Sequence, residues 1–176
     1  RRGDLLARLA LRSAERERDG LLRRLRRLDA VHGARVVAGG RELTVFCSND
    51  YLGLAAHPEV VAALRRAADE GVGATSAHLV CGHHREHQAL EEELADWTRR
   101  DRALLFSSGW LANLGAMQAL LGHGDACVQD RLNHASLLDA AKLAGCGLKR
   151  YPHADAAGAA RQLAGVAGAP ALLASD

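Results

Sequence analysis

The stretch ACVQDRLNHASLLDAAKLAG, residues 126–145, has the most informative pattern in the sequence. It opens with a short apolar run at 126–128 and closes with a helix-like run at 137–143. Between the two lies a polar crossing that carries His134. A buried strand that passes through a short loop into a helix is the repeating step of α/β proteins.

The same alternation continues on both sides of this stretch. Strands are predicted at 103–107, 126–130, 148–152 and 171–175, and helices at 110–122, 136–145 and 155–166. Strands that alternate with helices of about ten residues favour βαβ units and a parallel sheet. We therefore predict an α/β fold for this part of the chain.

The N-terminal part has a different pattern. Leucines at helical spacing predict one amphipathic helix or two within residues 4–30. Two short apolar runs around Gly39 and Gly40 predict a β-hairpin. Further elements are expected in the order helix, glycine-rich loop, helix, at residues 57–71, 71–84 and 85–100. We expect residues 1–50 to form an N-terminal helical and hairpin segment and residues 51–176 to begin a large α/β domain.

Composition excludes several classes of protein. The 176 residues are 48% hydrophobic and 25% charged, with a formal net charge of +2, which is too small to indicate a nucleic-acid partner. The four cysteines are widely spaced and contain no C-x-x-C pair, so free thiols are expected rather than disulfides or a zinc site. No apolar run approaches the ~20 residues of a membrane span, and no signal peptide opens the sequence. We therefore expect a cytoplasmic protein.

The turn Ser107-Ser108-Gly109 follows one predicted strand and precedes the helix that begins near Trp110. Backbone amides at a helix start point outward, and the helix dipole favours an anion there. Ligands of open α/β sheets bind at the carboxyl ends of the strands, where this turn is expected. A bound phosphate is one interpretation, and an ordinary N-cap is the other.

His134 lies in the crossing that follows the next strand. Ser136 and Asp139 fit a capping box, which predicts that the helix begins at Ser136 and places His134 in the loop before it. The histidine then lies at the same sheet edge as the Gly109 turn. Local sequence leaves open whether it is a loop residue or part of a site.

A metal site is not expected. His83 and His87 are four residues apart, but the run CGHHREH lacks the H-E-x-x-H arrangement and a third ligand at plausible spacing. The G-x-G of GVGAT follows a predicted helix rather than a strand, so a dinucleotide fingerprint is not expected either.

Four longer stretches together resemble one family. They are FCSNDYLGLAAHPEV, HQALEEELADW, LLFSSGWLANLGAMQALL and DRLNHASLLDAAKLAG. In this order and spacing they are similar to the α-oxoamine synthases, pyridoxal-phosphate enzymes of the aspartate-aminotransferase fold (fold type I). The resemblance covers the chain from about Leu22 to its last residue.

The resemblance implies a cofactor, a reaction and partners. The glycine of SSGW and the string DRLNHASLLDAA look like the biotin-pathway member of the family. That member condenses L-alanine with a pimeloyl thioester, carried by coenzyme A or by acyl carrier protein, with loss of carbon dioxide. The sister enzymes (5-aminolevulinate synthase, 2-amino-3-ketobutyrate CoA ligase and serine palmitoyltransferase) remain alternatives, as does a non-catalytic module.

The resemblance also assigns roles to residues. Gly109 and Trp110 match the turn whose amides hold the cofactor phosphate, and His134 matches the histidine that stacks on the pyridoxal ring and helps to hold substrate. Arg23 falls at the position of an arginine that binds a substrate carboxylate, with Arg24 and Arg26 as competitors. Asn49 matches a polar residue of the active-site loop near the substrate.

No catalytic residue of the family is expected within these 176 residues. Neither Lys142 nor Lys149 matches the motif of the Schiff-base lysine. The sequence stops at ALLASD, a strand signal in the middle of the alternating series, so we expect the N-terminal portion of an enzyme of about twice the length, inactive alone. The fold family further implies a homodimer.

Overall fold

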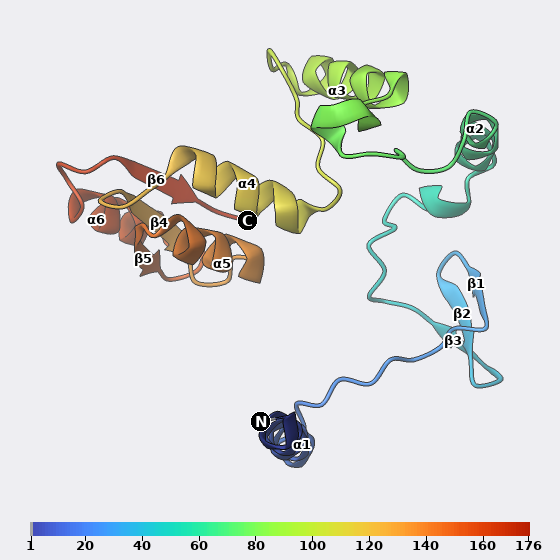
Figure 1. Cartoon of the computed structure of the whole chain (residues 1–176), viewed down its shortest axis with the longest axis horizontal. Helices are drawn as coiled ribbons and strands as arrows, with labels where there is room; N and C mark the ends of the chain where they lie inside the picture. The colour runs from blue at the N-terminus through green and yellow to red at the C-terminus, as the bar shows by residue number, and fades with distance from the viewer. Residues whose placement is uncertain (1) are drawn as a thin grey trace. The chain divides into compact units, whose positions relative to one another are not determined.

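The structure is a computed structural model that describes residues 2–176, without the side chains of residues 2, 3 and 32. The chain divides into two compact units, residues 1–73 and 74–176 (Figure 1). The boundary between them falls in the glycine-rich stretch that was predicted as a loop. Each unit is described separately.

The first unit contains a small antiparallel sheet and three helical segments. Its elements are α1 (Arg2–Arg18), β1 (Ala30–His32), β2 (Arg35–Ala38), β3 (Arg41–Thr44), the 3-10 turn η1 (Leu54–Ala56) and α2 (Pro58–Ala68). The predicted hairpin is confirmed, with Val36 opposite Leu43 and both turn glycines, Gly39 and Gly40, at positive φ. Strand β1 adds a third strand beside β2, which the sequence pattern did not predict.

The prediction of helix through residue 30 is wrong beyond Arg18. Gly20 adopts a left-handed conformation with φ 69°, and residues 21–28 are irregular and exposed. The leucines of this segment range from 37% exposed at Leu22 to fully exposed at Leu25. The helical spacing of the leucines therefore continues in the sequence beyond Gly20, although the helix ends at Arg18.

The second unit contains the predicted parallel sheet. Its helices are α3 (Arg85–Thr98), α4 (Gly109–Leu120), α5 (Ala135–Ala144) and α6 (Ala156–Ala164), preceded by the short π-helical turn η2 (His78–Gly82). Its strands are β4 (Ala126–Asp130), β5 (Gly147–Tyr151) and β6 (Ala171–Ala174). Both β5 and β6 run parallel to β4, and the order across the sheet is β5-β4-β6. The α/β prediction is confirmed in this unit.

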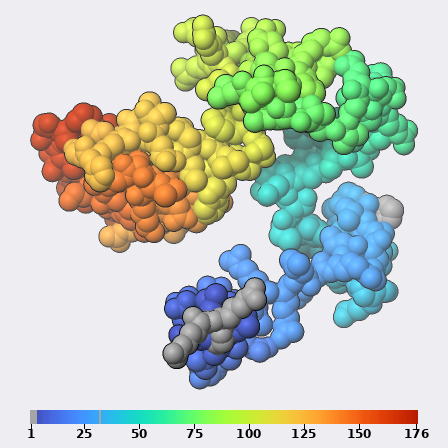
Figure 2. Space-filling model, viewed as in Figure 1, coloured from blue at the N-terminus to red at the C-terminus, as the bar shows by residue number. Residues whose placement is uncertain are grey.

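The core forms on both faces of β4. All five residues of this strand are buried, as expected for the central strand of a covered parallel sheet. Cys127 packs with Met117 of α4 and with Ala140 of α5 on one face. Val128 packs with Tyr151 and with Ala159 of α6 on the other. The space-filling view shows these elements as one packed body, coloured from yellow to red (Figure 2).

The strand predicted at 103–107 is not formed. These residues are irregular, and among the described residues none pairs with them in a ladder. Leu104 is largely exposed, and the backbone N–H of Leu105 donates to the carboxylate of Glu91 at 2.8 Å. An apolar run becomes a strand only where a neighbouring strand accepts its backbone hydrogen bonds. Residues 103–107 have no such neighbour among the described residues, so the prediction of a strand here is wrong.

The cysteines are free, as expected: Cys47 and Cys81 are exposed, Cys127 is buried and Cys146 is partly buried. Burial in the apolar core raises the pKa of the Cys127 thiol, opposed by a hydrogen bond from Gln129.

Candidate functional site at the carboxyl end of β4

The N-terminus of α4 offers free backbone donors. Ser108 is the N-cap, in an extended conformation, and its Oγ accepts a hydrogen bond from the Leu111 N–H at 3.3 Å. Gly109 and Trp110 are the first two helical residues, so their N–H groups have no acceptor within the helix. A Cβ placed on Gly109 would meet no atom within 4 Å, so the fold leaves room for a methyl group at this position. Together with the helix dipole, this geometry suits a phosphate.

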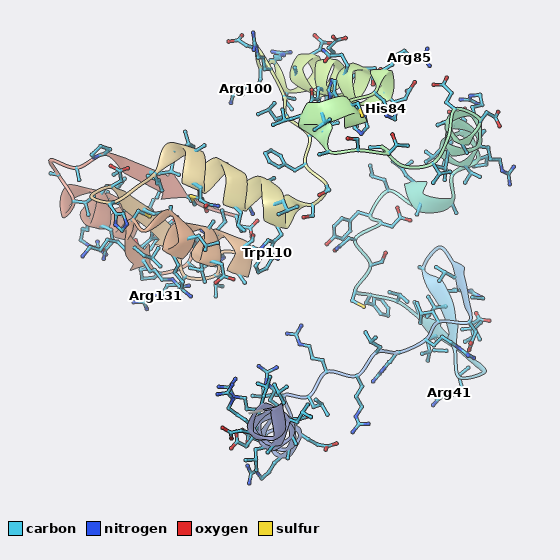
Figure 3. The ribbon with its side chains drawn as sticks, in the orientation of Figure 1. Arg41, His84, Arg85, Arg100, Trp110 and Arg131 are labelled. Carbon is cyan, nitrogen blue, oxygen red and sulfur yellow. The ribbon has the colours of Figure 1, made fainter. Side chains whose placement is uncertain are left out.

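His134 lies beside this helix start. It follows β4, and its backbone N–H donates to Oδ2 of Asp176, which comes after β6, at 3.0 Å. The imidazole and the Trp110 indole meet edge to face, with ring centroids 5.9 Å apart and an interplanar angle of 80°. Trp110 is labelled at the start of α4 in Figure 3. The structure thus brings Gly109, Trp110 and His134 together, although they are predicted from separate motifs.

The start of α5 differs from the prediction. The helix begins at Ala135, and the N-cap is His134, whose Nδ1 accepts from the Ser136 N–H at 3.2 Å. The Asp139 carboxylate does not cap the helix but lies 3.6 Å from the ammonium of Lys142. The predicted capping box is wrong. It would pair the Ser136 N–H with the Asp139 carboxylate, but in the structure this N–H donates to Nδ1 of His134. His134 is therefore held by its own helix and is not a free loop residue.

The side chain of Asn133 connects the same crossing to β6. Its Nδ2 donates to the carbonyl of Ala174 at 2.9 Å, and its Oδ1 accepts from the Asp176 N–H at 3.0 Å. Asn133 is buried. These bonds and the Asp176 contact to His134 tie the crossing to the end of the neighbouring strand, so the backbone that carries the histidine is fixed.

Two further polar residues that sequence reasoning missed support the site. Asn113 of α4 donates from Nδ2 to Oγ of the buried Ser136 at 2.8 Å. Asn113 lies four residues after Gly109 and therefore on the same face of the helix. This spacing is the sequence signal that could have identified it. Asp130, the last residue of β4, is also buried and was not predicted to have a role.

Asp130 holds the loop that follows β5 against the end of β4. Its carboxylate accepts from the Leu132 N–H at 2.8 Å, from the Ala154 N–H at 3.1 Å and from the His153 ring at 3.1 Å. The bond from Leu132 is the largest cause that lowers the pKa of Asp130; Ala154 and His153 act in the same direction, against burial, which raises it. Asp130 is thus an ionised anchor beneath the crossing.

Arg23 and Asn49 belong to the first unit. Both are exposed, Arg23 in the irregular segment after α1 and Asn49 in the irregular segment after β3. Of the two competitors, Arg24 pairs with Glu17.

The imidazoles of the CGHHREH run cluster with His78. The ring of His78 contacts that of His83, and the His87 ring centroid lies 5.3 Å from that of His78. Within residues 2–176, no group of three or more potential ligands is arranged to hold a metal ion. A search of the described helices for one long and apolar enough to cross a membrane finds none.

Comparison with known proteins places this arrangement in a family. The sequence model described as aminotransferase class I and II matches residues 41–172. The chain is 60% identical over 146 residues to the 8-amino-7-oxononanoate synthases of Xanthomonas euvesicatoria pv. vesicatoria (strain 85-10) and of Xanthomonas campestris pv. campestris (strain B100). Each match covers 82% of this chain and 36% of the relative, so the chain spans about a third of the length of these curated relatives.

Solved structures show the same fold. A serine palmitoyltransferase from Sphingomonas wittichii superposes with a TM-score of 0.83 at 29% identity, over 94% of this chain and 42% of that one. An 8-amino-7-oxononanoate synthase from Francisella tularensis superposes with a TM-score of 0.59 at 29% identity, over 73% of this chain and 35% of that one. A serine palmitoyltransferase described as holding a pyridoxal-phosphate internal aldimine gives a TM-score of 0.86 at 25% identity, over 96% of this chain and 44% of that one. The chain belongs to the aminotransferase class I and II family, and the relatives it resembles at 60% identity are 8-amino-7-oxononanoate synthases.

Proposed function

We propose that the full-length protein is a pyridoxal-phosphate-dependent acyltransferase that condenses L-alanine with a pimeloyl thioester, on coenzyme A or on acyl carrier protein, to give 8-amino-7-oxononanoate for biotin synthesis. The observation that carries this proposal is the 60% identity to curated synthases of that name over 82% of the chain. The geometry of the second unit supports it, because an open anion site and a fixed imidazole lie side by side.

The residues present fit the cofactor. The N–H groups of Gly109 and Trp110, which have no acceptor within α4, would bind its phosphate. The ring of His134, an exposed residue whose Nδ1 accepts from the Ser136 N–H, would cover the pyridine face and orient the amino acid. When bound, pyridoxal phosphate supplies an electron sink that stabilises the carbanion left when alanine loses its α-proton.

Two residues of the first unit are proposed as substrate ligands. The guanidinium of Arg23 would bind a substrate carboxylate, since planar bidentate pairing suits that group. The carboxamide of Asn49 would contact substrate near the cofactor. Both side chains are exposed and available for such contacts.

The lysine that carries the cofactor is proposed to lie in the remainder of the full-length protein. Lys142 is in the last turn of α5, at the opposite end from His134, and pairs with Asp139. Lys149 is an exposed residue in the middle of β5, opposite Val128. Neither is placed to meet a cofactor at the Gly109 turn, so we expect the 176 residues alone to be inactive.

We also propose the setting of this site. Residues 51–176 would form the first part of the cofactor-binding domain, with residues 1–50 as an N-terminal segment. The intact enzyme would work as a homodimer in the cytoplasm, as implied by the family fold.

A sister enzyme is the second candidate, because serine palmitoyltransferases superpose with TM-scores of 0.83 to 0.86. Such an enzyme would use serine, and other sister synthases would use glycine, in place of alanine. Amino-acid preference of the full-length protein separates these possibilities. The identity of 60% to the alanine-type synthases, against 25–29% to the serine palmitoyltransferases, favours the first.

Replacement of Gly109 by proline tests the phosphate site. Proline is favourable at the first helical position, and the extended conformation of Ser108 (φ −160°, ψ 154°) suits a residue before proline. The helix therefore remains while one amide donor disappears. A hydrogen bond to a charged group contributes about 1.5–3 kcal/mol, so affinity for pyridoxal phosphate should fall about 10- to 100-fold.

The measurement is an absorbance titration of the full-length apoprotein with pyridoxal phosphate. Gly109→Ala is the matched control, because it adds a methyl group into open space and keeps the N–H. We expect near-normal affinity in the control. Equal affinity in the folded proline variant and the wild type would rule out the proposed phosphate contact.

A further inference from the structure

The hydroxyl of Ser136 lies between two side chains from different helices. It is fully buried in the first turn of α5. Its Oγ is 2.8 Å from Nδ2 of Asn113 on α4 and 2.7 Å from Nδ1 of His134. The backbone N–H of Ser136 also points at Nδ1, at 3.2 Å. The chain Asn113–Ser136–His134 thus connects the helix that begins at Gly109 with the imidazole.

The direction of every hydrogen in this chain follows from the chemistry of the groups. A backbone N–H can only donate, so Nδ1 of His134 is the acceptor of the Ser136 amide and carries no proton. A carboxamide NH₂ also only donates, so Oγ of Ser136 accepts from Asn113. The hydroxyl proton is then free to point at Nδ1. All three contacts are satisfied in one arrangement, with the ring proton on Nε2.

We propose that Asn113 and Ser136 are positioning residues that hold His134 as the neutral Nε2–H tautomer and fix the plane of its ring. This inference rests on the proposed function, in which the ring covers the cofactor. A proton on Nδ1 would face the backbone N–H of Ser136, which can only donate, so one donor would be set against another. The only ring nitrogen left for substrate is Nε2, as a donor, which suits a carboxylate oxygen of the amino acid.

The arrangement also couples two parts of the site. Asn113 is on the helix whose N-terminus would hold the phosphate, and Ser136 is in the first turn of the helix that His134 caps. A cofactor held at one end by α4 and covered by a ring attached to α5 requires these helices to keep their spacing. The Asn113–Ser136 bond is a direct polar link between them.

Variants of the full-length protein test the inference. Ser136→Ala removes the hydroxyl donor to Nδ1 without adding volume, and Asn113→Leu removes the more peripheral partner. Asp155→Ala is the control for stability, because it removes the N-cap of α6, a helix outside this network. Loss of such a cap is a purely structural defect.

The first readout requires no cofactor. In ¹⁵N spectra of histidine-labelled apoprotein, with the His134 signals assigned by their loss in His134→Asn, we expect Nδ1 of the wild type to be unprotonated and Nε2 to be protonated. In Ser136→Ala only the longer bond from the backbone N–H, at 3.2 Å, still favours an unprotonated Nδ1, so we expect a larger fraction of the Nδ1–H tautomer than in the wild type. In Asp155→Ala we expect the wild-type pattern. A protonated Nδ1 in the wild type, or an unchanged tautomer in Ser136→Ala, would overturn the proposal.

The second readout separates positioning from stability. For Ser136→Ala we expect the KM for alanine to rise about 10-fold, as for a lost hydrogen bond, with a smaller change in kcat. Asn113→Leu alone should raise the KM for alanine about 3-fold. Added to Ser136→Ala it should cause no further rise, because Asn113 acts through the hydroxyl of Ser136. Additive effects of the two substitutions would contradict the relay. If the wild type binds no pyridoxal phosphate, the proposed function fails, while the tautomer measurement still decides the relay.

Discussion

Among single residues, Asp130 makes the clearest contribution to stability. Its pKa is lowered by bonds from Leu132, Ala154 and His153. A carboxyl group whose folded-state pKa lies below its unfolded value stabilises the fold above the unfolded pKa, near pH 4, and loses this contribution as pH falls through the folded pKa. The acid side of the stability curve therefore depends partly on this residue.

We expect Asp130→Asn to reduce stability at about pH 6 and to matter progressively less toward about pH 3, because protonation of Asp130 in the wild type removes the ionised acceptor that the variant lacks at every pH. Urea denaturation of the wild type and the variant at several pH values measures the difference in midpoint. A difference that stays constant over this range would show that the charge of Asp130 contributes nothing.

The residues of the site were only partly predictable from sequence. The places of Gly109 at the start of α4 and of His134 in the crossing after β4 agree with the local patterns, and their roles stay predictions. Ser136 was assigned the role of N-cap, which His134 holds in the structure. Asn113 and His153 meet their partners over 23 residues of sequence, and no local pattern encodes such a distance. Contacts between residues of different elements could be identified only from the folded structure.

Among the elements, α5 depends on the glycine that ends it. Gly145 has φ 72°, a left-handed conformation that L-residues with a Cβ rarely adopt, and its N–H donates to the Lys142 carbonyl at 3.2 Å. A Cβ at this position would lie 2.8 Å from the ring of His123. Both the backbone and its surroundings therefore require glycine.

Gly145→Ala should lower the free energy of unfolding by about 1–2 kcal/mol, the cost of placing alanine in the left-handed region, with some addition from the displaced ring. Gly122→Ala is the matched control, because its φ is ordinary and the nearest atom to the new Cβ is 3.9 Å away. Chemical denaturation of both variants decides the matter. Equal stability of the two variants would contradict this account of the helix end.

Prediction of elements succeeded where a segment packs within its own unit. The strands β4, β5 and β6 and the helices between them match the pattern because each buries the face that the pattern marks. The failures at 21–28 and 103–107 share one cause. Both segments have an apolar pattern but expose leucines and lack ladder or helix partners among the described residues. An apolar sequence pattern identifies residues that can be buried. The packing of the folded chain determines whether they are buried.

For the whole molecule, the main fact is that the chain spans about a third of the length of its curated relatives. The curated relatives extend well beyond the matched 146 residues, since these make up 36% of their length. On the proposal above, the second unit would supply the phosphate site and the oriented imidazole but not the lysine that reacts. Activity is therefore expected of the full-length protein and not of the 176 residues alone.

The most direct test of the central claim is the amino-acid dependence of thiol release from pimeloyl-CoA by the full-length protein loaded with pyridoxal phosphate. We predict that alanine supports the fastest release of free coenzyme A and that the product has the mass of 8-amino-7-oxononanoate, with serine and glycine much slower. Faster release with serine or glycine, or no release with any of the three, would contradict the account.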